Sequence, residues 1–195
     1  MRLFGKPNFI EIIDNAISNE ECDILISLFE KSDHKNGHVF ADGIDKLVPE
    51  AKQCRQLSLN FKDGDVISNI VLSSLKPLIK RYKEKYKVLD YDMAPWIYFP
   101  KYSFQKYETE DDGFKRWHTE HGPEEESSKR IMAWMFYLNN AKSGTEFMYH
   151  PTISSKKGRG VIWPAGWEYV HRGVIPNQGL KYIVTGWISF REDEV

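Results

Sequence analysis

The sequence predicts an α+β protein, mainly β, in which N-terminal helices pack on one face of a jelly roll. Helical periodicity occurs within residues 1–87, whereas residues 88–190 contain short β-like runs separated by Gly, Pro, Asn and Asp. Many short strands at this spacing are typical of a β-sandwich or jelly roll. Hydrophobic residues make up 41% of the chain and aromatic residues 14%, which is enough for a sizeable core. We therefore expect a single domain over residues 1–195, with a helical N-terminal part and a jelly-roll core.

The N-terminal third of this chain begins with a predicted strand, helix and loop. Residues 8–17 favour a short strand followed by a turn. Ser18 and Glu21 have the spacing of a capping box, in which each side chain bonds the backbone N–H of the other residue. Apolar residues follow at helical spacing, so the first helix should run to about Ser32. Residues 33–63 are polar and broken by glycine and proline, which indicates a loop region with one short strand.

A second, longer helix is expected from Asp65 to Lys87, where apolar residues form a stripe at helical spacing. Pro77 should kink this helix, because proline removes a backbone donor. The basic side chains of the last turns suit the negative end of the helix dipole. We interpret them as a solvated helix end rather than as a nucleic-acid-binding patch.

Seven β-like runs are expected after residue 88, and turn-forming residues separate them. From residue 94 to residue 190 they should form two facing sheets. In the last run, alternation should place Lys181, Ile183 and Thr185 on one face, with Lys181 pointing inward beside Tyr137. The expected strands are Trp96–Phe99, Phe104–Tyr107, Arg130–Leu138, Glu146–Tyr149, Gly160–Trp163, Glu168–His171 and Lys181–Phe190.

The charge and the cysteine content argue against several classes of function. The formal net charge is -1, so no large basic field indicates nucleic-acid binding. Cys22 and Cys54 are too few for a disulfide framework and fit a reducing cytosol. No stretch approaches the ~20 apolar residues of a membrane span, and the first residues lack the apolar segment of a signal peptide. We therefore expect a cytoplasmic protein without a membrane partner, of an oligomeric state that the sequence does not specify.

Two histidines, a carboxylate and a lysine indicate the chemistry of the predicted site. His118 and Glu120 form a His-x-Glu pair, and His171 follows in a later β-like run. Such a set can form a 2-His-1-carboxylate face, which leaves metal positions open and points to non-heme Fe(II) oxygenase chemistry. Lys181 comes ten residues after His171 and could hold the carboxylate of a bidentate organic cosubstrate. His121 directly follows Glu120, so on an extended strand it would point to the opposite face.

A series of segments agrees in order and spacing with one enzyme family. The segments are Phe104–Tyr107, Trp117–Glu120, Arg130–Asn139, Ser143–Phe147, Gly158–Pro164, His171–Gly173 and Lys181–Trp187. Through them, residues 88–190 resemble the Fe(II)/2-oxoglutarate-dependent dioxygenases, and within these the prolyl 4-hydroxylase-like branch. The distal histidine followed ten residues later by a lysine is a specific feature of that branch. The resemblance implies a double-stranded β-helix that holds Fe(II) and 2-oxoglutarate.

The resemblance also implies roles for the four central residues. His118, Glu120 and His171 would bind iron as the catalytic centre, and Lys181 would pair with the distal carboxylate of 2-oxoglutarate. The 2-oxo acid can chelate the metal through its ketone and its C1 carboxylate, and O2 would take the remaining position. Ascorbate is a further cofactor candidate. Glu120 stands where most of the family has aspartate, and the sequence does not specify whether this changes the affinity for the metal.

Four further residues receive roles from the same resemblance. Tyr137 and Tyr107 would hydrogen-bond the cosubstrate, although both could simply fill the barrel. Arg130 matches a position that faces the substrate in some relatives. Trp187 lies where the family places a tryptophan beside the site, so it is either part of the core or a wall of the substrate site.

Three hypotheses of function follow from these observations. The first is a dioxygenase that hydroxylates a protein or peptide side chain, with proline as the leading candidate. The second keeps the same cofactors but takes a free amino acid or another small molecule as its substrate. The third is a non-catalytic jelly-roll binding module. The joint presence of His118, Glu120, His171 and Lys181 argues against the third, because such a module has no need of them.

Overall fold

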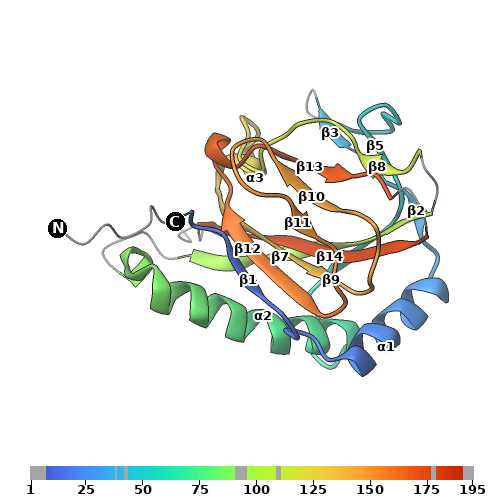
Figure 1. The fold of residues 1–195 in the computed structure, drawn as a ribbon, viewed down its shortest axis with the longest axis horizontal. Coiled ribbons are helices and arrows are strands. Elements are labelled where there is room, and N and C mark those ends of the chain that lie inside the picture. The colour runs from blue at the N-terminus through green and yellow to red at the C-terminus, as the bar shows by residue number, and fades with distance from the viewer. Residues whose placement is uncertain are drawn as a thin grey trace.

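The computed structural model describes residues 8–37, 39–41, 44–90, 96–108, 111–176 and 179–190. The first seven residues, in which the sequence predicts no signal peptide, lie outside this part of the chain. Two long helices lie along one side of a large antiparallel sheet, and the smaller sheets lie on its other side (Figure 1). This is the predicted jelly roll with the N-terminal helices packed on one face.

The larger sheet has seven strands, and each strand runs antiparallel to its neighbours. In sheet order these are β1 (Glu11–Ile13), β12 (Arg159–Pro164), β9 (Arg130–Tyr137), β14 (Lys181–Phe190), β7 (Trp96–Tyr107), β6 (Arg55–Asn60) and β2 (Lys35–Asn36). The second sheet contains β11 (Ile153–Ser154), β10 (Gly144–Phe147) and β13 (His171–Val174). The described residues also form two short two-stranded ribbons, β3 (Val39–Ala41) with β4 (Ile44–Lys46) and β5 (Lys52–Gln53) with β8 (Gly113–Phe114).

The helices begin where the sequence predicts. Helix α1 (Asn19–Glu30) has the expected capping box, because the Glu21 N–H donates to Ser18 Oγ at 3.2 Å and the Ser18 N–H donates to the Glu21 carboxylate at 3.1 Å. Helix α2 (Val66–Lys85) begins at Asp65, whose carboxylate accepts the Ser68 N–H at 2.7 Å. The shorter helices are α3 (Glu125–Ser128) and the 3-10 turns η1 (Lys87–Asp90) and η2 (Trp167–Tyr169).

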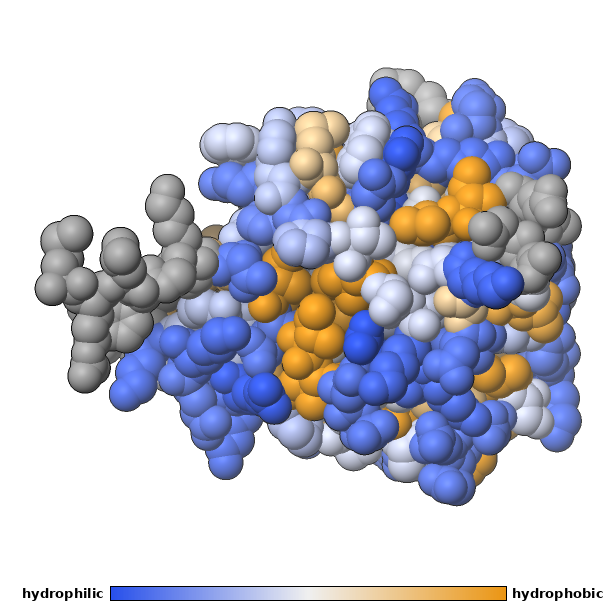
Figure 2. All heavy atoms as spheres, viewed as in Figure 1, coloured by the Kyte–Doolittle hydropathy of each residue, from blue (hydrophilic) through white to orange (hydrophobic). Residues whose placement is uncertain are grey.

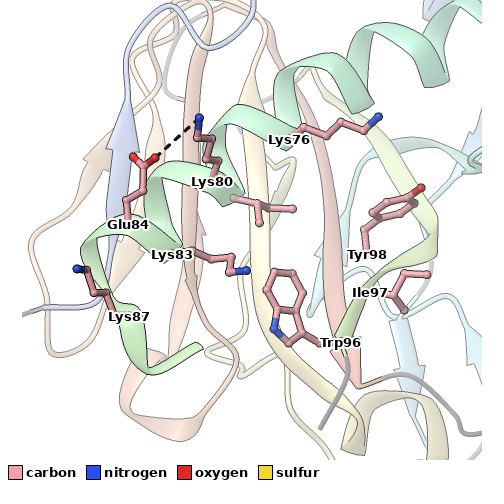
Figure 3. A pocket seen from close by; sticks show the side chains of 9 residues that line it. Lys76, Lys80, Lys83, Glu84, Lys87, Trp96, Ile97 and Tyr98 are labelled. Carbon is pink, nitrogen blue, oxygen red and sulfur yellow. Dashed lines mark ion pairs between the residues drawn. The ribbon is translucent and has the colours of Figure 1, made fainter. Parts of the chain in front are cut away.

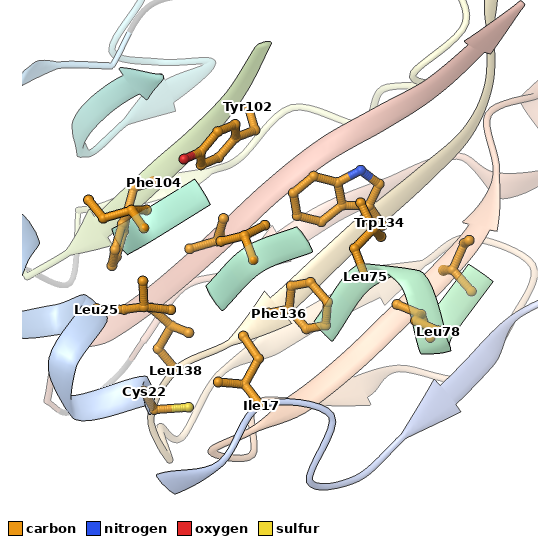
Figure 4. Close-up of a cluster of buried hydrophobic side chains, with 14 of the residues drawn as sticks. Ile17, Cys22, Leu25, Leu75, Leu78, Tyr102, Phe104, Trp134, Phe136 and Leu138 are labelled. Atoms are coloured by element: carbon orange, nitrogen blue, oxygen red, sulfur yellow. The ribbon is translucent and has the colours of Figure 1, made fainter. Parts of the chain in front are cut away.

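The main hydrophobic core lies between the helices and the larger sheet (Figure 4). Leu25 of α1 and Leu75 of α2 are fully buried there, against Trp134 and Phe136 of β9. Burying aliphatic and aromatic side chains of this size contributes about 1.5–3 kcal/mol each. The helices therefore close one face of the sheet, and the opposite face of β9 and β14 remains to line an interior site.

A second hydrophobic cluster lies between the two sheets. It joins Tyr137 and Ile183 of the larger sheet to Phe147 and Ile153 of the smaller sheet. The two sheets therefore face each other, as the sequence predicts for residues 94–190.

The region from residue 33 to residue 63 differs from the prediction of a loop with one short strand. Among the described residues of this region there are five strands, β2 to β6, and β6 pairs along β7 with Leu57 opposite Phe104. The partners of β5 and β6 lie far along the chain, in β8 and β7, so the local sequence carries little of the signal for these two strands. The remaining strands pair within the region, β3 with β4 and β2 with β6.

Several predicted strands also have wrong boundaries. The predicted strand Glu146–Tyr149 is β10, which begins at Gly144 and ends at Phe147. Trp96–Phe99 and Phe104–Tyr107 form one continuous strand, β7. Pro100 lies where the register between β7 and β14 shifts, which is a position that tolerates proline. The predicted strand Glu168–His171 is a 3-10 turn followed by β13, which begins at His171.

The outer surface is mostly polar on the face shown in Figure 2, with an apolar area over β1 and β12. Ile12 of β1 is 39% exposed. Because β1 is an edge strand of three residues, it offers few backbone groups for pairing with another chain. Among the described helices, none combines the length and the apolar character that crossing a membrane requires.

Candidate active site

His118 and His171 are held side by side by their own backbones. The N–H of each residue donates to the carbonyl of the other at 3.0 Å, which forms an antiparallel bridge. Glu120 follows two residues after His118, so its side chain lies on the same side of the extended segment. One ligand atom from each of the three residues lies within 4.8 Å of the others. The structure therefore brings together the three residues that the sequence proposes as metal ligands.

The ring orientations suit metal binding. His118 Nδ1 lies 3.0 Å from the Arg116 carbonyl, and His171 Nδ1 lies 2.9 Å from the Tyr169 carbonyl. Since a carbonyl only accepts, each Nδ1 carries the proton and each Nε2 keeps its lone pair. The Nε2 atoms face Glu120 Oε1, at 3.3 Å from His171 and 4.0 Å from His118.

The charge states follow from the surroundings. Burial, together with the nearby His171, lowers the pKa of His118 to about 3, so this imidazole is neutral at physiological pH. Burial alone would raise the pKa of Glu120, but the contact with His171, the neighbouring His118 and the guanidinium of Arg130 hold it well below its usual range. Neutral imidazoles and an ionised carboxylate are the forms that bind a divalent cation. The donor set thus fits the non-heme iron site that the sequence predicts.

Aromatic rings enclose the cluster, and local sequence patterns do not reveal them. The Phe114 ring stacks on His118 with a centroid distance of 3.7 Å. On the other side, Trp163 meets His171 edge-on at 5.2 Å. These rings fix the imidazoles and keep solvent from their faces.

The cluster opens into a cavity of about 450 Å³ between the sheets. Lys181 also lines this cavity, is 3% exposed and donates from Nζ to the Gly144 carbonyl at 2.8 Å. Its Nζ lies 5.2 Å from the Tyr107 ring centroid and 5.8 Å from the Tyr137 ring centroid. Burial lowers the pKa of Lys181 to about 7.

A buried ammonium group calls for an anion, because an unpaired buried charge is costly. Within the described part of the chain, Lys181 has no carboxylate partner at ion-pairing distance. A dicarboxylate with one end at the histidine cluster would supply that partner. The cavity therefore fits the cosubstrate that the sequence implies, as well as the metal.

The alternation expected for the last strand is confirmed. Lys181, Ile183 and Thr185 line the cavity, whereas Tyr182 and Val184 belong to the core beneath the helices. The inward position of Lys181 beside Tyr137 is confirmed as well.

The rings of Tyr137 and Tyr107 both lie near Lys181, but their hydroxyls contact protein groups. The Tyr137 hydroxyl lies 2.6 Å from Thr145 Oγ1, and the Tyr107 hydroxyl donates to Gln105 Oε1 at 2.5 Å. Thr145 and Gln105 are not among the residues predicted for the site. Gln105 could have been found, since it lies two residues before Tyr107 and so shares its face of the strand.

Arg130 and Trp187 line the cavity, as expected for residues near the substrate, and they also touch each other. The guanidinium of Arg130 lies 3.6 Å from the Trp187 ring centroid. His121 is exposed and bonds the Arg130 carbonyl through Nδ1 at 3.1 Å. It lies outside the three-residue cluster, in agreement with the prediction that it points away.

A larger hollow of about 730 Å³ lies between the last turns of α2 and the start of β7 (Figure 3). Its lining includes four lysines with Trp96, Ile97 and Tyr98, and Lys80 pairs with Glu84 at 3.9 Å. Among these lining residues there is one carboxylate and no histidine, so the hollow offers no metal site. This is the basic helix end that the sequence predicts to be solvated.

Comparison with known proteins agrees with the geometry. Residues 102–189 match the family model of the 2OG-Fe(II) oxygenase superfamily. The matched segment contains the histidine cluster and Lys181, and it covers most of the jelly-roll core. Residues 102–189 are therefore similar to a 2OG-Fe(II) oxygenase domain. The superfamily uses Fe(II), 2-oxoglutarate and O2.

Several solved structures with the same fold are prolyl hydroxylases. The viral collagen prolyl hydroxylase of Paramecium bursaria Chlorella virus-1, solved with 2-oxoglutarate, is 19% identical, with a TM-score of 0.68 over 93% of this chain and 96% of that one. A prolyl hydroxylase of Trichoplax adhaerens, bound to a peptide of hypoxia inducible factor, is 15% identical, with a TM-score of 0.70 over 94% and 84% of the chains. The Pseudomonas putida prolyl-4-hydroxylase is 12% identical, with a TM-score of 0.63 over 94% of each chain. A search of curated protein sequences gives no significant match.

Proposed function

We propose that this chain is an Fe(II)- and 2-oxoglutarate-dependent dioxygenase that hydroxylates a protein or peptide side chain, with proline as the leading candidate. One observation carries the proposal. The cluster of His118, Glu120 and His171 and the buried Lys181 line the same cavity. A dicarboxylate cosubstrate needs these two features together, a metal site for its oxo acid and a cation for its distal carboxylate.

Each end of the cavity has a distinct task. Bound Fe(II) would supply the activation of O2, coupled to the conversion of 2-oxoglutarate into succinate and CO2. His118, Glu120 and His171 would hold the metal, and Lys181 would orient the cosubstrate by its distal carboxylate. The Tyr137 hydroxyl, already placed by Thr145, has hydrogen-bonding capacity left for the same carboxylate. The Phe114 and Trp163 rings would exclude water from the metal end.

Two observations bear on the substrate. The prolyl hydroxylase of Trichoplax adhaerens binds a peptide, which supports a peptide substrate for a chain of the same fold. A small polar molecule is the second candidate, because the remaining cavity wall contains Gln56, Ser58, Lys101 and Ser103. These polar side chains could bind a free amino acid or a similar molecule.

Succinate formation tests the activity. The protein, supplied with Fe(II), 2-oxoglutarate and O2, should form succinate above the level of a His171→Ala variant. His121→Ala is the matched control, since it removes an exposed histidine outside the cluster and should retain activity. Equal succinate formation by the wild type and His171→Ala, with every substrate tried, would refute the proposal. Repeating the assay with and without ascorbate would test that cofactor.

A substrate panel then separates the two candidates. Proline-containing peptides and free amino acids, proline among them, are each incubated with the active enzyme and analysed by mass spectrometry for the gain of one oxygen atom. Oxygen gain in peptides alone supports protein hydroxylation. Oxygen gain in free amino acids alone would replace it by the small-molecule alternative.

A further inference from the structure

We propose that Trp187 and Arg130 are positioning residues for Glu120, which fix its carboxylate so that Oε1 alone faces the metal. The inference rests on the proposed metal site and deepens it. By resemblance, both residues are assigned to the neighbourhood of the substrate, and nothing in that assignment concerns the metal ligand. The contacts of the two side chains indicate the additional role.

The two oxygens of Glu120 have different surroundings. Oε1 faces the histidines, with His171 Nε2 at 3.3 Å and His118 Nε2 at 4.0 Å. Oε2 accepts the indole N–H of Trp187 at 2.7 Å and lies 3.9 Å from the Arg130 guanidinium. The carboxylate is therefore oriented, with one oxygen engaged by the protein and the other directed to the ligand cluster.

Arg130 holds the indole in place. Its guanidinium lies against the Trp187 ring, at 3.6 Å from the centroid. The same group donates to Glu126 Oε1 at 2.6 Å and to the Glu120 carbonyl at 3.4 Å. The Arg130 side chain is only 15% exposed, so these contacts restrict its freedom. Arg130 thus links the backbone of Glu120 to the ring that binds the side chain of Glu120.

The length of the glutamate side chain explains why Glu120 needs residues that fix its orientation. Glutamate has one more methylene than aspartate and so one more rotatable bond that must be ordered for ligation. A hydrogen-bonded neighbour restricts a metal-binding carboxylate to one orientation. The indole N–H is a donor only, so it cannot compete as a ligand. Trp187 therefore compensates for the extra freedom of Glu120.

Metal affinity in a double-mutant cycle tests this inference. Mn(II) binding is titrated by the electron paramagnetic resonance signal of the free ion, in wild type, Trp187→Phe, Glu120→Asp and the double variant. Trp187→Phe should weaken Mn(II) binding by about 10- to 100-fold, the usual effect of removing a group that orients a ligand. Trp96→Phe is the matched control and should bind like wild type, because Trp96 lines the hollow beside α2 and not the cavity.

The Glu120→Asp variant shows whether Trp187 acts through its hydrogen bond to Glu120 or only through packing. Aspartate is shorter and should not reach the indole, so Trp187→Phe should change Mn(II) affinity by less than about twofold in Glu120→Asp. An equal loss in both backgrounds, or no loss in Trp187→Phe, would overturn the role of Trp187. Arg130→Gln should give a smaller loss that disappears once Trp187 is replaced, and an additive loss would overturn the role of Arg130.

The outcome for the wild type distinguishes this inference from the proposed function. If wild type binds Mn(II) and forms succinate while Trp187→Phe binds equally well, the inference alone fails. If wild type neither binds Mn(II) nor forms succinate, the proposed function fails and the inference fails with it. Thermal unfolding of each variant ensures that only folded protein is compared.

Discussion

The two ends of the cavity are organised in opposite ways. At the metal end, each residue of the ligand set is already held by a hydrogen bond: the imidazoles bond backbone carbonyls through Nδ1, and Glu120 Oε2 accepts from the Trp187 indole. At the far end, Lys181 is buried with a neutral carbonyl as its hydrogen-bond acceptor. The protein thus holds the metal ligands in place by itself, whereas the positive charge of Lys181 at the far end is neutralised only when an anion binds. Changes at the two ends should therefore have different consequences.

The largest effect is expected at the metal end. His171→Ala or His118→Ala should abolish 2-oxoglutarate turnover, because either change removes one of the three proposed ligands. The fold should persist, since these residues line a cavity and the main core lies beneath the helices. Succinate formation and circular dichroism measure the two outcomes. A variant that turns over 2-oxoglutarate at the wild-type rate would remove that histidine from the ligand set.

The second-largest effect is expected at the far end, where Lys181 lies. Lys181→Met should raise the apparent KM for 2-oxoglutarate and leave Mn(II) affinity nearly unchanged. Losing a charge-assisted contact of about 1.5–3 kcal/mol weakens binding by about 10- to 150-fold. Lys80→Met on the exposed helix surface is the control and should leave the KM as it is. An unaltered KM in Lys181→Met would show that this lysine does not anchor the cosubstrate.

The pH dependence of 2-oxoglutarate binding should show a further difference between the Lys181 end and the metal end of the cavity. Burial lowers the pKa of Lys181 to about 7, so without the cosubstrate the amine loses its proton above that pH. A bound carboxylate favours the ammonium form, so binding above pH 7 takes up a proton. The dissociation constant for 2-oxoglutarate should therefore rise with pH, by about tenfold per unit while the complex stays protonated. Lys181→Arg should lose this dependence, because arginine stays charged.

Calorimetry at pH 6, 7, 8 and 9 would follow this change, with Mn(II) in place of iron. The wild-type dissociation constant should be nearly flat between the two lowest values and then increase. A flat profile up to pH 9 would mean that Lys181 keeps its proton in the free protein.

The contrast between the two ends also explains what the sequence could predict. His118, Glu120 and Lys181 stand in short motifs, and strand alternation alone places Lys181 inside. The contact between Trp187 and Glu120 joins residues 67 positions apart and has no local signature. The same holds for β5 and β6, whose partners β8 and β7 lie far along the chain. Residue types and periodicity thus predict a site, whereas tertiary pairing decides how each ligand is held.

The smallest effect is expected for Tyr137, which lies beside Lys181 at the far end. Its hydroxyl meets Thr145 Oγ1 at 2.6 Å, and its ring lies beside the ammonium group of Lys181. Tyr137→Phe keeps the ring and removes one neutral hydrogen-bonding group, which contributes about 0.5–1.5 kcal/mol. The affinity for 2-oxoglutarate should fall by about 2- to 13-fold. Mn(II) affinity should not change, because Tyr137 does not belong to the ligand cluster.

Thr145→Val supplies the comparison for that variant. It removes the partner of the Tyr137 hydroxyl but leaves the hydroxyl itself free to bind the cosubstrate. If the hydroxyl acts on 2-oxoglutarate, Thr145→Val should weaken binding less than Tyr137→Phe does. Equal losses in the two variants would indicate that the Tyr137–Thr145 contact only supports the cavity wall, and that Lys181 alone anchors the distal carboxylate.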